Sequence, residues 1–161
     1  MPDLLWDDVK RFFDPEAMGT LPDVHVADAS VEDWQAVLDL VAASRWQWQY
    51  SEGAVVRSMP LAEAVFSRPV DAECPELRVW PTPGVLAIFR FYAPEEIDFD
   101  VDLCELQGQD RLDVLCGLLR VIGHRLGRSV VMTPEGDADQ PVLGFYAESD
   151  RVVLLTEVSA K

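Results

Sequence analysis

Residues 97–103 read Ile-Asp-Phe-Asp-Val-Asp-Leu and alternate strictly between apolar and acidic side chains. Successive side chains of a β-strand point to opposite faces of the sheet, so Asp98, Asp100 and Asp102 should share one face. The apolar side chains share the other face, where they need a core to pack on. This alternation is typical of an antiparallel sheet that is buried on one side and solvated on the other.

A second alternating segment covers residues 46–50, Trp-Gln-Trp-Gln-Tyr. As a strand it places Trp46, Trp48 and Tyr50 in one stripe. Aromatic side chains stabilise sheets by packing across strands, so one interpretation places this stripe in the core. The other makes it an exposed platform for a partner, because interfaces are enriched in Trp and Tyr. The intervening glutamines suit water, which favours the core.

Turn signals and periodicity predict an α+β fold in which strands mostly follow strands. We expect a single domain over residues 1–161, with a mainly antiparallel sheet of about six to eight strands and about two to four helices packed on it. Helices are expected over residues 3–13, 31–43, 60–66 and 111–126. Strands are expected over residues 24–26, 46–50, 54–57, 77–80, 85–92, 97–103, 130–133, 142–146 and 152–156.

The ends of two helices can be predicted from single residues. Asp14-Pro15 should end the first helix, and a loop should follow over residues 15–22. Asp110 is a suitable N-cap for the longest helix, and Gly127 stands at the position after its last turn.

The charge balance is strongly acidic, with 13 Lys and Arg against 29 Asp and Glu and a formal net charge of −16. Such a surface repels nucleic acids and anionic lipids, so neither is an expected partner. It attracts basic proteins and speeds their association at low salt. The alternative is that the charge serves solubility alone.

Several classes of site and location have no support in the sequence. The three cysteines, Cys74, Cys104 and Cys116, have neither zinc-site nor disulfide-framework spacing. Neither a signal peptide nor an apolar run of membrane-spanning length is present, so we expect a cytoplasmic protein. The phosphate-binding glycine motifs are also missing, and we assign no cofactor.

The three aspartates at 98, 100 and 102 admit three interpretations. They are the solvated face of a one-sided sheet, a docking stripe for a basic protein, or part of a metal or acid–base site. The EF-hand template fails, because Leu103 and Gln109 stand where it needs Gly and Glu. Arg90 would lie opposite Asp98 in one register of the preceding strand and not in the next one.

Other candidate groups carry weaker signals. His25 falls in a short strand, and His124 lies on the longest helix away from its apolar stripe. The loop acids Glu135, Asp137 and Asp139 could hold a cation, although a solvated turn explains them as well. We therefore predict no catalytic residue and no metal ligand.

Residues 77–81 (Leu-Arg-Val-Trp-Pro), 99–103 (Phe-Asp-Val-Asp-Leu) and 141–145 (Pro-Val-Leu-Gly-Phe) resemble segments of small acidic proteins from actinobacteria. That resemblance implies no activity and no site residue. In size, acidity and aromatic content the chain is also similar to bacterial toxin-immunity proteins. This similarity implies tight binding of a basic toxin through an acidic surface.

The leading hypothesis is therefore an acidic module that binds a basic protein. The sequence favours a role other than catalysis and leaves an enzyme open. One alternative is a hydrolase or metal-dependent enzyme that uses a carboxylate cluster, with a concave site where the acids meet His25 or His124. The other is a structural homodimer. The predicted partner-binding residues are Asp98, Asp100, Asp102, Trp46, Trp48 and Tyr50.

Overall fold

The computed structural model describes residues 2–69, 71–137 and 139–155. Within these residues the chain forms one nine-stranded sheet in the order β3-β2-β4-β5-β6-β1-β7-β8-β9, with all neighbours antiparallel. The strands are β1 (Asp23–Val26), β2 (Gln47–Glu52), β3 (Val55–Arg57), β4 (Glu76–Thr82), β5 (Val85–Ala93), β6 (Glu96–Val101), β7 (Val130–Thr133), β8 (Leu143–Tyr146) and β9 (Arg151–Leu154).

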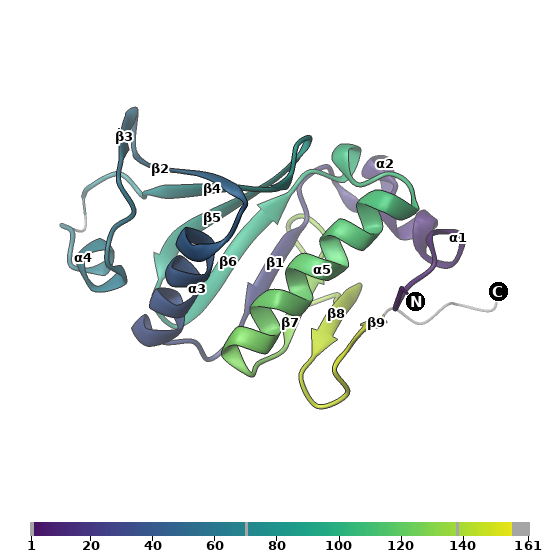
Figure 1. Cartoon of the computed structure of the whole chain (residues 1–161). Helices are drawn as coiled ribbons and strands as arrows, with labels where there is room; N and C mark the ends of the chain where they lie inside the picture. Colours follow the sequence, from purple (N-terminus) through teal and green to yellow (C-terminus); the bar gives the residue numbers. More distant parts are fainter. Residues whose placement is uncertain (1, 70, 138, 156–161) are drawn as a thin grey trace.

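Five α-helices and two short 3-10 turns complete this described part of the chain (Figure 1). The predicted α+β class is confirmed, and the strands and helices slightly exceed the expected numbers. The helices are α1 (Trp6–Val9), α2 (Pro15–Met18), α3 (Val31–Ala43), α4 (Ala62–Phe66) and α5 (Gln109–Leu126), and the turns are η1 (Lys10–Phe13) and η2 (Leu103–Glu105).

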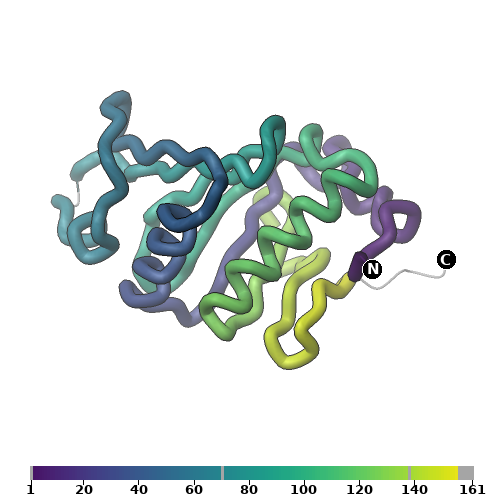
Figure 2. Tube along the Cα trace, viewed as in Figure 1, coloured from purple at the N-terminus to yellow at the C-terminus, as the bar shows by residue number. Residues whose placement is uncertain are grey.

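The order of the strands follows the chain except at two places, β3, which lies at the edge outside β2, and β1. Strands β4, β5 and β6 form the predicted meander, but β1 lies between β6 and β7 (Figure 2). Leu103 N–H donates to Thr20 C=O at 2.9 Å, which continues the pairing of the N-terminal segment with the end of β6. An early strand thus reaches the middle of the sheet, where it brings Asp23 and His25 beside β6.

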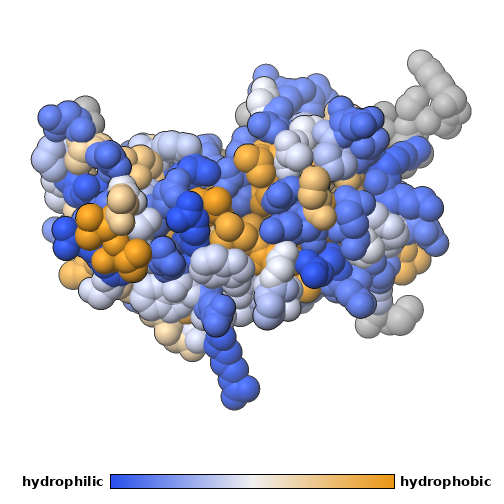
Figure 3. Space-filling model, turned by 90° about the horizontal axis from the view of Figure 1, so that it is seen from above, coloured by the Kyte–Doolittle hydropathy of each residue, from blue (hydrophilic) through white to orange (hydrophobic). Residues whose placement is uncertain are grey.

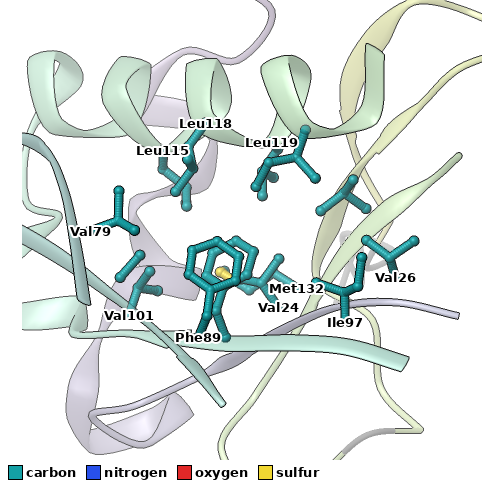
Figure 4. Close-up of a cluster of buried hydrophobic side chains, with 14 of the residues drawn as sticks. Val24, Val26, Val79, Phe89, Ile97, Val101, Leu115, Leu118, Leu119 and Met132 are labelled. Atoms are coloured by element: carbon teal, nitrogen blue, oxygen red, sulfur yellow. The ribbon is translucent and has the colours of Figure 1, made fainter. Parts of the chain in front are cut away.

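Helices α3 and α5 lie side by side over one face of the sheet, and we call this the covered face (Figure 1). The alternating apolar side chains of the central strands point into it, with Phe89, Phe99 and Ile97 fully buried. Leucines of α5 pack on them from above, including Leu115 and Leu119 (Figure 4). Each such buried side chain contributes about 1.5–3 kcal/mol, so this layer holds the fold together.

Gly123 sets how closely α5 approaches the sheet. A Cβ atom at this position would lie 2.1 Å from the Phe145 ring on β8, a separation that real Cβ atoms do not reach. Four residues later, Gly127 adopts a left-handed conformation (φ 64°) and ends the helix, as predicted. The glycines therefore fix both the spacing and the end of α5.

Four predicted boundaries are corrected. The helix expected over residues 3–13 is α1 followed by η1, whose tighter winding accompanies the burial of Phe13. The loop expected from residue 15 begins with α2, because the Asp14 carboxylate accepts a hydrogen bond from Glu16 N–H. The N-cap of α5 is Gly108, and Asp110 lies in its first turn. Strand β9 ends at Leu154, and Thr156 lies outside the described residues.

Candidate partner-binding face

The face of the central strands opposite α3 and α5 carries polar side chains, and we call it the open face. Registers across β4, β5, β6 and β1 arrange these side chains in two rows. The first row runs Glu76, Arg90, Asp98, His25, and the second runs Arg78, Ile88, Asp100, Asp23. All eight residues are partly buried, so their charges lie close to one another and partly out of water.

Three aspartates meet on this face, and we call Asp23, Asp98 and Asp100 the carboxylate cluster. Asp23 lies directly opposite Asp100, and His25 lies directly opposite Asp98. Opposed side chains in an antiparallel pair have Cβ atoms about 4.5–5.5 Å apart, where like charges repel. The cluster therefore concentrates negative charge on two adjacent strands.

Arg90 neutralises part of this charge. Its Nη1 donates to Glu76 Oε2 at 2.6 Å, while Nη2 and Nε donate to Asp100 Oδ2 at 3.2 and 3.3 Å. The register places Arg90 opposite Asp98, one of the two arrangements that the sequence allowed. Its ion pair nevertheless goes to Asp100, because the long guanidinium reaches diagonally along the neighbouring strand.

Asp23 and Asp98 are left without a cation. Neither side chain forms a hydrogen bond or ion pair within the described part of the chain. Burial raises the pKa of Asp98 to about 7, and the nearby Asp23 carboxylate adds to this shift. Burial and the Asp100 charge also raise the pKa of Asp23. These two carboxylates are the unsatisfied part of the face.

Asp100 combines a satisfied oxygen with an unsatisfied one. Its Oδ2 accepts the Arg90 hydrogen bonds, whereas Oδ1 is buried and accepts none within the described residues. Burial raises the pKa of Asp100 in spite of the Arg90 charge. A buried acceptor without a donor is costly, so this oxygen adds to the unsatisfied part of the face.

Asp102 does not belong to the stripe that the alternation predicted. Strand β6 ends at Val101, and the Asp102 carboxylate accepts a hydrogen bond from Cys104 N–H at 2.9 Å. The aspartate thus begins η2 instead of extending the strand, which is the usual preference of Asp at a helix start.

The aromatic stripe lies on the covered face, away from the cluster. Tyr50 is 1% exposed, and its hydroxyl donates to Glu52 Oε2 at 2.9 Å. Burial and this hydrogen bond raise the pKa of Tyr50. Trp46 and Trp48 are partly buried against the core. The interpretation of the stripe as core fits this placement, and Tyr50 leaves the set of candidate contact residues.

The two histidines occupy different environments. His25 sits in the open face beside Asp98, and it also lines a cavity of about 340 Å³ with Asp28, Arg128 and Ser129. None of the cluster aspartates lines that cavity. His124 contacts Asp150 on the other side of the molecule, against the Phe145 ring. The acids and His25 therefore meet on a sheet surface and not in a concave pocket.

Among the residues that the structure describes, no group of three or more His, Cys, Asp or Glu is arranged to hold a metal ion. In the loop after β7, the Glu135 carboxylate accepts a hydrogen bond from Leu21 N–H at 3.0 Å. That contact ties the loop to the segment before β1 and gives Glu135 a structural role.

The sequence analysis did not include Asp23 among the site residues. The alternation of residues 23–26 does indicate that Asp23 and His25 share one face of a strand. The pairing of β1 with β6 joins residues far apart in the chain, and no local pattern specifies it.

Comparison of the chain with models of known protein families, with curated proteins and with solved structures gave no match. Among the helices in the described residues, none is long and apolar enough to cross a membrane.

Proposed function

We propose that this chain binds a basic protein through its open face. The observation that carries the proposal is the pair of carboxylates, Asp23 and Asp98, that lie partly buried with no cation of their own. Lys or Arg side chains of a partner would supply the missing charges. The same contact would offset the repulsion between Asp23 and Asp100 across the strands.

The chemistry of the face supports a binding role because the arrangement disfavours folding of the isolated chain. Asp is a poor strand residue, and like charges directly opposite each other are destabilising. Natural sequences keep such local conflicts chiefly where function requires them. The fully buried layer on the covered face stabilises the fold enough to offset the cost of the opposed aspartates.

The net charge of −16 supports the same proposal through association kinetics. An acidic surface steers a basic partner toward it and raises the association rate at low salt. Seen from above, the molecular surface is mostly hydrophilic and is interrupted by apolar patches (Figure 3). An immunity-like inhibitor that blocks a basic toxin is one protein of this kind.

The homodimer alternative is disfavoured for this face. Two open faces brought together would place carboxylate clusters of the same sign against each other, with Arg78 and Arg90 already paired within each copy. Like-charge contacts of that kind cost several kcal/mol, on the order of what an interface must gain.

The enzyme alternative rests on one specific observation, the register that places His25 opposite Asp98, a carboxyl whose pKa is raised to about 7. A group that titrates near neutral pH can act as a general acid or base. A small substrate nevertheless needs a concave site, and the carboxylates Asp23 and Asp98 line none of the cavities described here. The flat surface favours a macromolecular partner.

The decisive experiment measures capture of a basic partner from the native lysate and then its binding rate at two salt concentrations. A variant with Asp23→Asn, Asp98→Asn and Asp100→Asn removes the cluster charges. The matched control carries Glu32→Gln, Glu63→Gln and Glu148→Gln, exposed residues outside the open face, so both variants change the net charge equally.

We expect the cluster variant to lose about tenfold or more in association rate at low salt, with a flatter salt dependence, while the control changes by about twofold or less. Equal losses in both variants would mean that net charge alone acts, and the open face would not be the contact surface. Unchanged binding in the cluster variant would also reject the proposal.

A further inference from the structure

A small cavity lies at the edge of the open face, and we call it the anchor pocket. Its volume is about 140 Å³. Four apolar residues form one part of its wall, and three acidic residues form another. The apolar residues are Leu21, Leu86, Ile88 and Val101, and the acidic residues are Asp100, Asp102 and Glu105.

We propose that the anchor pocket receives one long cationic side chain, Arg or Lys, from the basic partner. The inference rests on the proposed function and deepens it, because it names the residue type that the partner must present. The aliphatic stem of such a side chain packs on leucine and isoleucine while its charged head stays among carboxylates. No other residue type satisfies both parts of this wall.

The walls come from separate parts of the chain that hold them in place. Leu86 N–H donates to Glu105 Oε1 at 3.0 Å, which ties β5 to η2. The Asp102 carboxylate is held by Cys104 N–H. Leu21, which is 41% exposed, closes the pocket from the segment before β1. A preformed site of this kind binds with little ordering cost.

The two arginines near the pocket donate few hydrogen bonds to its carboxylates. Arg111 Nη1 donates to the backbone carbonyls of Gly84 and Glu105, at 3.0 and 3.1 Å, and not to a carboxylate of the pocket. Arg90 occupies Asp100 Oδ2, while Asp100 Oδ1 stays buried without a hydrogen bond in the described part of the chain. One of the residues that line the pocket thus carries an acceptor whose hydrogen-bonding capacity is unused.

An apolar or acidic side chain fits the pocket less well. An apolar side chain would remove water from the acidic wall without replacing its hydrogen bonds, which costs free energy. An acidic side chain would add a like charge in a partly buried space. The pocket thus favours a partner side chain that is positively charged and long, with an aliphatic stem that can lie on Leu86 and Ile88.

The test uses the isolated chain and three defined probes, the N-acetyl methylamides of arginine, lysine and norleucine. Methyl resonances of Leu21, Leu86 and Ile88 are followed by NMR during each titration. We expect saturable shifts at these methyls, with a half-saturation concentration about fivefold lower for the cationic probes than for norleucine. Equal shifts from all three probes, or shifts that do not saturate, would overturn the proposal.

Two variants sharpen the same titration. Leu21→Ala removes an exposed wall of the pocket, and we expect it to raise the half-saturation concentration of the cationic probes at least about threefold. Asp98→Asn removes a carboxylate of the open face that does not line the pocket, and it should change the value less than twofold. A larger effect of Asp98→Asn than of Leu21→Ala would place the cation on the cluster and overturn the pocket.

The two proposals fail separately. The capture experiment with the cluster variant decides whether the open face binds a basic partner, and the probe titration needs no partner. Partner capture that depends on the cluster, together with failed probe binding, would remove the anchor pocket alone. Probe binding without cluster-dependent capture would remove the proposed function and leave a cation-selective pocket.

Discussion

On the covered face, Phe89 and Phe99 lie opposite each other on β5 and β6, with ring centroids 4.5 Å apart. One residue along the same strands, on the open face, Arg90 lies opposite Asp98 without forming an ion pair with it. Both pairs lie in the same backbone register. The two phenylalanine rings pack against each other, whereas the Asp98 carboxylate has no ion pair among the residues described. The two faces of the same strands thus differ in how completely their side chains are satisfied.

The difference has a physical origin in how the two kinds of contact depend on their surroundings. Apolar burial is non-directional and grows with area, so nearly any close packing on α5 stabilises the covered face. A charged pair gains only if the opposite charge outweighs the loss of hydration. Asp23 and Asp98 lose hydration without an ion pair in the described part of the chain, so their charge is poorly compensated.

The largest expected effect comes from breaking the covered face. Phe99→Ala removes a fully buried ring and should lower the free energy of unfolding by about 3–5 kcal/mol. The control is Ile88→Ala on the open face, which removes a partly buried side chain and should cost clearly less. Urea unfolding followed by tryptophan fluorescence measures both. Equal losses would show that the two faces share the stabilising role.

The sequence predicted the two-faced character of the sheet from local patterns alone. Period-two alternation in residues 97–103 and 46–50 assigns faces, and that assignment needs no knowledge of neighbouring strands. Helix α3, which packs on the covered face, was also predicted with its observed bounds, from its cap at Ser30 and its apolar spacing. Local chemistry determines these features, so local reasoning recovers them.

The composition of the candidate site depends on contacts that are not local. The cluster needs β1 beside β6, and the ion pair of Arg90 depends on a register that alternation leaves open. The place where a strand ends was decided by one side-chain hydrogen bond at Asp102, which competed with strand pairing. Sequence patterns therefore gave two of the cluster aspartates and missed Asp23.

A second prediction tests how the open face tolerates its charge. Arg90→Met removes the guanidinium that bridges Glu76 and Asp100, and we expect a loss of about 2 kcal/mol in the free energy of unfolding at pH 8. The control is Arg78→Met, whose ion pair with Glu76 is more exposed and should matter less.

The same variant should become less destabilising as the pH falls toward 5. Burial raises the pKa of Asp98 to about 7, so this carboxylate takes up a proton in that range and the negative charge that Arg90 faces falls. The pKa of Asp100 is raised in the same direction. Urea unfolding at pH 5 and pH 8 measures the change. A loss that is independent of pH would show that Arg90 acts through packing of its stem and not through charge.

The smallest expected effect, and the only one with a stabilising sign, is that of Asp98→Asn. The pKa of Asp98 rises from its usual 3.8 to about 7 in the folded chain, so the folded state binds a proton more tightly than the unfolded state. This contribution to stability is fully present below about pH 4 and is lost as the pH rises through about 7. The uncharged asparagine avoids that loss.

We therefore expect Asp98→Asn to match the original chain near pH 4 and to exceed its stability by about 1–2 kcal/mol at pH 8, after allowance for solvent screening of a partly exposed group. Glu148→Gln, at an exposed turn residue, is the control and should show no such pH dependence. Because the same substitution should weaken binding of a basic partner, a gain in stability that accompanies a loss of binding would link the stability cost of this open-face charge to its role in binding. If Asp98→Asn were neutral at pH 8, the carboxylate would be well solvated, and the open face would hold no unsatisfied charge at this position for a partner to neutralise.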